Sequence, residues 1–359
     1  MTLMTWCWNY SLQWKGNSCE KIKDILQPYQ SRLKTVFFVI VSILVIVELT
    51  RLSKTISIAD IKRILDTIPL FNLILILVIG FITVCPMVWY DIILNKMLKT
   101  NYSKSYIFET GFATNAINNL AGFAGLVEIG LRYSFYSEGK ASDESVAQQI
   151  SKVMPFFMSG LSIYSGISLV CLLLPQGNHG MMLYLPVILG GMLYLPFVYF
   201  ISARKSLTYF GQLNRTYRHQ LLLASFLDWT GVLLSFISIG YLAGFHLPIY
   251  DLIPIYIIAV VVGLMSMIPS GIGGFDIVLI SGLTSAGLGH SQAVTWLLLF
   301  RIAYYILPFL VGVGFFIKHI GGRVNQKFLG LPKTISTALT TNLELAFLKL
   351  FVFFSFYQP

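Results

Sequence analysis

Apolar stretches long enough to cross a lipid bilayer constrain this chain more than any other feature of its sequence. A membrane-spanning helix needs about 20 consecutive, mostly apolar residues. The stretches that meet or approach this length are 33–49, 70–94, 153–174, 181–201, 221–242, 292–317 and 335–357, the last of which contains Glu344 and Lys349. We therefore expect an all-α polytopic membrane protein with about seven spanning helices.

Charged residues are too scarce for a soluble protein of this length. They make up 11% of the chain and the mean hydropathy is +0.75, whereas a soluble domain carries roughly 25% charged residues. The net charge of +10 gathers in short loops, which fits an anionic cytoplasmic leaflet better than nucleic acid. The cysteines and histidines have no metal-site spacing, so the sequence predicts no metal and no cofactor.

Two further apolar regions are interrupted and do not resemble simple spans. Region 106–136 is broken by Gly122, Ala124 and Gly125, and region 252–288 is broken between Pro269 and Gly274. Irregular backbone at membrane depth is tolerated only inside protein or beside a water-filled cavity. We expect both regions to form re-entrant helical hairpins.

Lysine and arginine predict how these segments are oriented. Loops 95–104, 202–219 and 318–333 are basic, whereas loops 175–180, 243–251 and 287–291 contain neither residue. The positive-inside rule places the first group in the cytoplasm and the second outside. The two hairpins then enter from opposite faces, as in an inverted repeat with a substrate site near the midplane. Segment 50–68 is an exception, because it falls outside although it is basic, and residues 53–68 have the pattern of an amphipathic surface helix.

The chain divides into three parts on this interpretation. Residues 1–31 form a cytoplasmic, interfacial N-terminal tail, and residues 32–320 form the transmembrane domain with both hairpins. Residues 321–359 form a cytoplasmic loop followed by a terminal helix.

Asp276 and Arg301 are the charged residues predicted to lie deepest in the membrane. A charge at the bilayer centre costs roughly 2.5–3.5 kcal/mol on insertion scales, so it needs a partner or a wet cavity. The functional interpretation is a polar substrate site built from this pair with Tyr304 and Tyr305. The alternative is a structural ion pair that holds the second hairpin to its flanking helix.

Other polar residues near the breaks leave the same choice open. Glu128 and Arg132 are four residues apart, which suits either an internal helical ion pair or a substrate contact. The side chains of Asn115, Asn118 and Asn119 can bind a headgroup or satisfy backbone groups freed by the first break.

Two carboxylates lie near the cytoplasmic ends of spans. Asp91 and Asp228 can receive a substrate there, or can pair with Lys96 or Arg218 at the interface. At the second break, Ser270 supplies a capping hydroxyl beside exposed N–H groups at the start of a helix. That arrangement can bind a phosphate group, or the glycines can serve only to permit a tight turn.

The sequence contains no GxxxxGK[ST], GxSxG or HExxH motif, so no catalytic residue is assigned. It does resemble the membrane half of the bacterial multiple peptide resistance factor, a lysylphosphatidylglycerol synthase and flippase. The resemblance covers residues 33–320 through these blocks: WYDIILNKMLK (89–99), NAINNLAGFAGLVEIGLR (115–132), SFLDWTG (225–231), IPSGIGGFDIVLISGL (268–283) and LLLFRIAYYILPFLVG (297–312).

The resemblance implies a multi-pass protein of the bacterial plasma membrane, with a cytoplasmic N-terminus, that flips aminoacylated phosphatidylglycerol to the outer leaflet. This activity lowers the negative surface charge and gives resistance to cationic antimicrobial peptides. The family's intramembrane charged positions correspond here to Asp91, Arg132, Asp228, Asp276 and Arg301. Glu128 departs from the family, because a small residue is expected there, and Asp228 stands where glutamate is common.

The resemblance also implies binding partners, and it leaves alternative functions open. Phospholipids are the expected ligands. A separate synthase and a second copy of the chain are candidate protein partners, and no binding of nucleic acid is expected. Because the family's cytosolic synthase domain has no counterpart in these residues, we expect this chain alone to transfer no lysine. The alternatives are a part of a phosphatidylglycerol lysyltransferase, a transporter of another phosphate-bearing lipid, and a regulatory membrane subunit.

Overall fold

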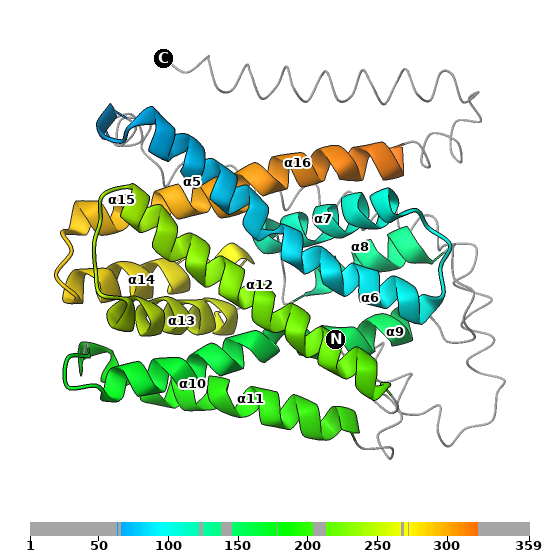
Figure 1. Cartoon of the computed structure of the whole chain (residues 1–359), viewed down its shortest axis with the longest axis horizontal. Coiled ribbons are helices and arrows are strands. Elements are labelled where there is room, and N and C mark those ends of the chain that lie inside the picture. Colours follow the sequence, from blue (N-terminus) through cyan, green and yellow to red (C-terminus); the bar gives the residue numbers. More distant parts are fainter. Residues whose placement is uncertain are drawn as a thin grey trace. The chain divides into compact units, whose positions relative to one another are not determined.

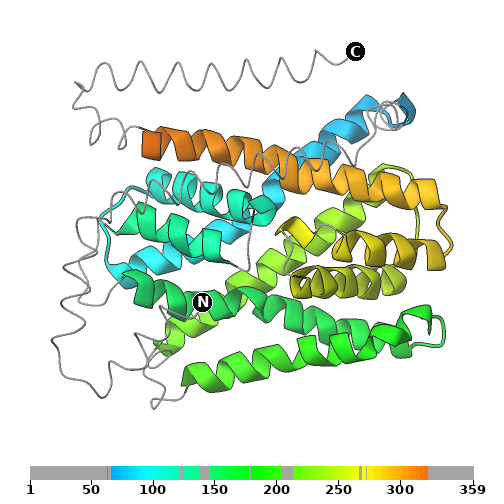
Figure 2. The same cartoon turned by 180° about the vertical axis from the view of Figure 1, so that it is seen from behind.

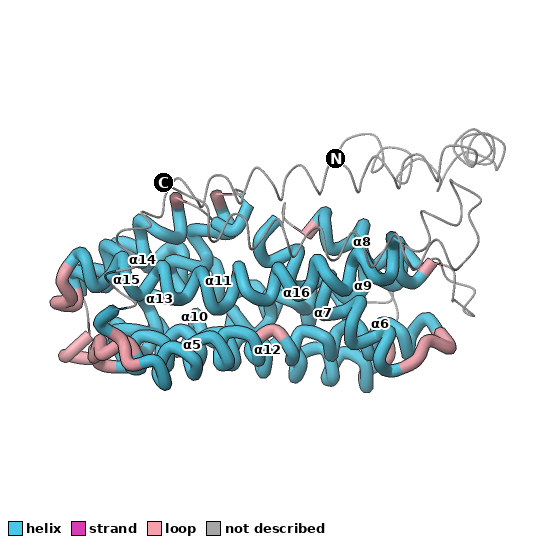
Figure 3. Tube along the Cα trace, turned by 90° about the horizontal axis from the view of Figure 1, so that it is seen from above, coloured by secondary structure: helices cyan, strands magenta, loops and turns pink. Residues whose placement is uncertain are grey.

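The computed structural model describes residues 63, 66–121, 125–137, 146–177, 179–203, 213–266, 269–271 and 273–321. All of them belong to one of two contact units of the chain, Thr50–Pro359. Within these residues every regular element is a helix, and short loops join the helices (Figure 3). The expected all-α class is therefore confirmed.

Five helical segments among the described residues are long and apolar enough to cross a membrane: Leu70–Leu98, Val146–Leu173, Gly180–Phe200, Arg215–Leu242 and His290–His319. They correspond to five of the predicted spans. The other two, 33–49 and 335–357, lie outside the described residues, as does most of the predicted amphipathic helix 53–68.

Most spans are built from consecutive helices that continue through a short change of winding. The first joins α5 (Leu70–Thr83), the 3₁₀ turn η2 (Cys85–Met87) and α6 (Val88–Leu98). The second joins α9 (Val146–Val153), η3 (Met154–Met158) and α10 (Ser159–Leu173). The third joins η4 (His179–Tyr184) and α11 (Leu185–Ala203).

The fourth span is the single helix α12 (Arg215–Leu242), and the fifth changes winding three times. It comprises α15 (His290–Phe300), the π-helix η6 (Arg301–Ile306), α16 (Leu307–Phe316) and the π-helix η7 (Ile317–Gly321). Pro86, Pro155 and Pro308 occupy the first turn of η2, η3 and α16. Proline has no N–H to donate, so these positions mark where the winding changes.

The two interrupted regions form helical hairpins. The first consists of α7 (Lys104–Ala121) and α8 (Leu126–Tyr136). The second consists of α13 (Ile249–Met265), the turn η5 (Pro269–Gly271) and α14 (Gly274–Ser285). Gly125 and Gly273 have φ angles of 80° and 95°, which non-glycine residues rarely adopt, so glycine permits both breaks.

The hairpins approach each other tip to tip. Figure 1 shows α7 and α8 reaching the middle of the bundle from one end of the long helices and α13 and α14 reaching it from the other, and Figure 2 shows the same from behind. The helix ends that carry Lys96, Lys104, Arg215, Arg218 and Lys318 lie at the end from which α7 starts, and the described loops without lysine or arginine, such as 243–248 and 286–289, lie at the other end. The described loops therefore segregate as the charge pattern predicts.

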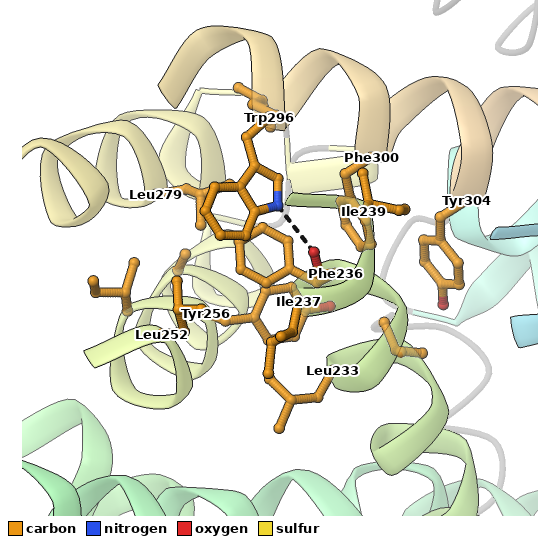
Figure 4. Packing of buried hydrophobic residues seen from close by; sticks show 14 of the residues in the cluster. Leu233, Phe236, Ile237, Ile239, Leu252, Tyr256, Leu279, Trp296, Phe300 and Tyr304 are labelled. Atoms are coloured by element: carbon orange, nitrogen blue, oxygen red, sulfur yellow. Dashed lines mark hydrogen bonds between the residues drawn. The ribbon is translucent and has the colours of Figure 1, made fainter. Parts of the chain in front are cut away.

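Close helix packing holds the second hairpin against the long helices. The buried core beside it joins α12, α13, α14 and α15, and the indole N–H of Trp296 donates to the Phe236 carbonyl at 2.9 Å (Figure 4). Gly240 lies under that indole, where any larger residue would overlap the ring. Small residues allow such close crossings, which stabilise helix packing in a membrane, where lipid tails are as apolar as the side chains.

Two boundaries differ from the prediction. The span expected at 153–174 begins earlier, at Val146, because Val146, Ile150 and Val153 share one buried helical face. The expected loop 202–219 is helical from Arg215, because the Asn214 side chain accepts a hydrogen bond from the Thr216 N–H at 3.1 Å and caps α12.

Candidate functional site

A cavity of about 340 Å³ lies between the two hairpin tips. The first hairpin contributes its three-asparagine run and Glu128, and the second contributes the turn η5 and the start of α14. The walls are completed by side chains from η2, α6, η3, α12, α13 and η6. The predicted site residues that line the cavity are Asn118, Asn119, Glu128, Asp228, Ser270, Tyr304 and Tyr305, together with Asn115.

Asp228 is the carboxylate that α12 presents to the cavity. Its side chain is 4% exposed, and Oδ2 accepts a 3.4 Å hydrogen bond from the Tyr90 hydroxyl. Its Oδ1 has no partner among the described residues. The alternative pairing with Arg218 does not occur, because the Arg218 guanidinium lies over the Tyr199 ring. A buried carboxylate oxygen without a partner is costly, which makes it a position where a ligand is stabilising.

Arg132 is fully buried and is held mainly by Asp91. Its Nε and Nη2 donate to the two oxygens of Asp91, both at 2.9 Å, in a bidentate pair. Nη2 also donates to Asn115 at 3.1 Å, and the Tyr136 hydroxyl donates to Asp91 at 3.0 Å. Asp91 therefore pairs with Arg132 and not with Lys96, because it points into the bundle and is fully buried. Neither Asp91 nor Arg132 lines the cavity.

Glu128 is the carboxylate of the same network that faces the cavity. One oxygen accepts from Nη1 of Arg132, as the four-residue spacing predicts, and the other accepts from the Asn118 amide at 3.3 Å. Because Asp91 already holds Arg132, the predicted Glu128–Arg132 pair is one edge of a three-residue cluster. That cluster holds two carboxylates and one guanidinium.

Aromatic rings form much of the remaining wall. The Asn119 amide donates to the Tyr304 hydroxyl at 3.2 Å, and the Tyr304 and Tyr305 rings meet edge to face with centroids 5.0 Å apart. The Trp229 N–H donates to the Phe157 carbonyl at 2.7 Å. Aromatic faces attract ammonium groups, so the wall suits a cationic headgroup.

The second break is capped differently from the prediction. Helix α14 begins after Gly273, and the Asp276 carboxylate accepts the Gly273 N–H at 3.0 Å. Ser270 lies earlier, in η5, with a φ of 49°, so its hydroxyl is not the N-cap. The positive end of α14 is therefore closed by a side chain of its own first turn, which leaves the predicted phosphate cradle less donor capacity.

Asp276 and Arg301 form the ion pair that the sequence suggests. Nε of Arg301 donates to Oδ1 of Asp276 at 3.1 Å, and its guanidinium lies beside the rings of Phe275 and Tyr305. Those two rings line the cavity, whereas Asp276 and Arg301 do not. The rings of Phe275 and Tyr305 thus separate the ion pair from the cavity, and the pair links α14 to η6.

Sequence reasoning missed several lining residues: Tyr90, Met154, Phe157, Trp229, Tyr256 and Phe275. Tyr90, Trp229 and Phe275 adjoin predicted charged residues in sequence, which is a signal that could have found them. Met154, Phe157 and Tyr256 lie in apolar stretches and have no such signal. The described residues contain no group of three potential metal ligands.

Comparison with known proteins decides the family. The family described as "Lysylphosphatidylglycerol synthase TM region" matches residues 36–312, which is most of the chain and includes every described residue that lines the cavity. This chain belongs to that family. The resemblance seen in the sequence is confirmed, and so is the multi-pass membrane character that the five long apolar helices indicate.

Named relatives extend beyond the region that this chain matches. A phosphatidylglycerol lysyltransferase of Bacillus subtilis (strain 168) is 26% identical over 323 residues, which cover 88% of this chain and 37% of the relative. A phosphatidylglycerol lysyltransferase of Staphylococcus aureus (strain MRSA252) is 27% identical over 299 residues, covering 81% and 34%. The chain thus spans little more than a third of the length of these relatives.

Proposed function

We propose that this chain moves aminoacylated phosphatidylglycerol, such as lysylphosphatidylglycerol, from the inner to the outer leaflet of a bacterial plasma membrane. Transport of this lipid would lower the negative charge of the outer surface and thereby weaken binding of cationic antimicrobial peptides. The N-terminus and the basic loops would be cytoplasmic. A separate synthase would supply the lipid.

The cavity between the hairpin tips carries this proposal. It lies between the tips of the two hairpins, which reach the middle of the bundle from opposite ends. Its described lining includes the carboxylates of Glu128 and Asp228 and several aromatic rings, but no lysine, arginine or histidine. Such a wall attracts ammonium groups and repels a headgroup whose only charge is a phosphate. This composition favours an aminoacylated lipid over other phosphate-bearing lipids.

The family description and the names of the relatives support a second candidate, in which this region serves lipid synthesis. In that case the cavity would present phosphatidylglycerol to a transferase. The absence of a cation from the described lining argues against this use, because phosphatidylglycerol is anionic. Co-expression separates the two candidates.

The experiment expresses the chain in bacteria with a separate lysylphosphatidylglycerol synthase and labels outer-leaflet amines with a membrane-impermeant reagent. We expect the labelled fraction to rise with the chain while total lysylphosphatidylglycerol stays constant. Asp228→Asn should reduce the rise about tenfold, because losing a hydrogen bond to a charged group costs about 1.5 kcal/mol or more, and about 1.4 kcal/mol corresponds to a factor of ten. Asp66→Asn, the same change at an exposed position outside the cavity, should leave the rise unchanged.

Two results would overturn the proposal. Lysylphosphatidylglycerol that remains in the inner leaflet when the wild-type chain is abundant excludes flipping. Lysylphosphatidylglycerol that forms with this chain and without the added synthase assigns the chain to synthesis.

A further inference from the structure

Among the described residues around the cavity, carboxylate groups outnumber cationic groups by two. Three carboxylates belong to this part of the described structure, those of Asp91, Glu128 and Asp228, and the cation Arg132 is bonded to the first two. Asp91 takes both parallel hydrogen bonds of the Arg132 guanidinium, so that pair neutralises itself. The carboxylates of Glu128 and Asp228 remain, and these two side chains line the cavity.

The two carboxylates come from separate elements and are not equivalent. Asp228 stands on α12 and keeps Oδ1 unpartnered among the described residues, although its side chain is more than nine-tenths buried. Glu128 stands on α8, where Arg132 and Asn118 fix its two oxygens. Oδ1 of Asn118 also lacks a described partner. The cavity therefore offers one acceptor group at Asp228 and a second at Glu128 and Asn118.

We propose that Glu128 makes the cavity selective for headgroups that carry two ammonium groups over headgroups that carry one. This inference rests on the proposed lipid transport and adds the class of substrate. One ammonium group meets Asp228 and the other meets Glu128, and the two excess charges are then neutralised. A headgroup with a single ammonium leaves either Glu128 or Asp228 without an ammonium partner, which is the less favourable state for a buried carboxylate.

The test uses two lipids of almost equal size. Lysylphosphatidylglycerol carries two ammonium groups, and its Nε-acetyl derivative carries one. The purified full-length chain is reconstituted in vesicles, and transport of each lipid is followed by its accessibility to a membrane-impermeant amine reagent. Binding of short-chain versions of both lipids to the detergent-solubilised chain is measured in parallel.

We expect the wild type to prefer the lysyl over the acetyl-lysyl lipid at least tenfold. Glu128→Gln should lower this ratio at least fivefold, because glutamine still accepts from Arg132 but brings no charge. Glu128→Asp should retain most of the preference, because it keeps the charge. Glu109→Gln, the same change on α7 at a carboxylate bonded to Lys318 outside the cavity, should leave the ratio unchanged.

Each outcome decides one claim. A wild-type ratio near one, or a ratio unaffected by Glu128→Gln, overturns the role of Glu128. The chain can also bind the two lipids with a selectivity that depends on Glu128 and yet transport neither. That result supports the role of Glu128 and contradicts the proposed transport function. Thermal unfolding of each variant shows whether a lost preference comes from misfolding.

Discussion

Arg132 stabilises the first hairpin because it is the guanidinium at the centre of a fully buried polar network. Replacing it with glutamine leaves Asp91 and Glu128 next to each other without a cation. Removal of one partner of a buried ion pair typically costs about 3–5 kcal/mol. We expect Arg132→Gln to lower the thermal unfolding temperature of the detergent-solubilised protein strongly, and Glu128→Gln, which leaves the Asp91–Arg132 pair intact, to lower it little.

A double substitution shows whether the cost comes from the unpaired charge. Arg132→Gln combined with Asp91→Asn should unfold at a higher temperature than Arg132→Gln alone, since neither charge is then left unpaired. An unfolding temperature of Arg132→Gln equal to that of the wild type would show that the network adds no stability.

Individual residues were predictable where their partners are near in sequence. The Glu128–Arg132 contact follows from helical spacing, and Asp276 and Arg301 were paired because both were expected to lie deep. The bond between Arg132 and Asp91 crosses 41 residues, and no local pattern encodes it. For the same reason the sequence could not show that Phe275 and Tyr305 separate the Asp276–Arg301 pair from the cavity. The roles of all these residues in transport remain predictions.

At the scale of helices, the crossing of α12 and α15 depends on Gly240. A β-carbon at this position would overlap the Trp296 ring, which is held by its hydrogen bond to Phe236. We expect Gly240→Ala to destabilise the protein by roughly 1–3 kcal/mol, the usual range for overpacking a core. The measurement is thermal unfolding in detergent.

Gly190 provides the matched control, because it lies within α11 and has open space where a β-carbon would be placed. Gly190→Ala should raise stability slightly, since alanine is the better helix former by about 1 kcal/mol. Equal effects of the two substitutions would contradict the role of the crossing.

The existence of the helices followed from sequence, whereas some of their ends and windings did not. Apolar length alone predicted the five described spans, small residues predicted the first hairpin break, and proline with glycines predicted the second. The π-helix at Arg301–Ile306 has no sequence signature, and it packs against α5, which is far away in the sequence. The start of α9 was missed because its buried face includes Gln149 and Lys152, which mask the apolar spacing.

For the whole molecule, the segregation of basic loops predicts which end faces the cytoplasm. Asn101 and Ser291 are exposed at opposite ends of the bundle. In a chain without its native cysteines, Ser291→Cys should react with a membrane-impermeant maleimide in intact cells, and Asn101→Cys only after permeabilisation. Reaction of both cysteines from the same side would contradict the opposed hairpins, and reversed accessibility would contradict the orientation. Segment 50–68 makes this test necessary, because its basic residues oppose the assignment.

The meeting of two hairpin tips in the middle of the bundle also has an electrical consequence. In a membrane that the bundle crosses from end to end, Glu128 and Asp228 lie partway down the voltage drop and not at either surface. Moving one elementary charge across the full thickness changes its energy by about 2.3 kcal/mol per 100 mV. A charge that travels only as far as a cavity at mid-depth does roughly half of that work, about 1.2 kcal/mol. With a cavity at mid-depth between the opposed hairpins, the electrical work of moving a charge across the membrane is divided into two parts, each about half of the total.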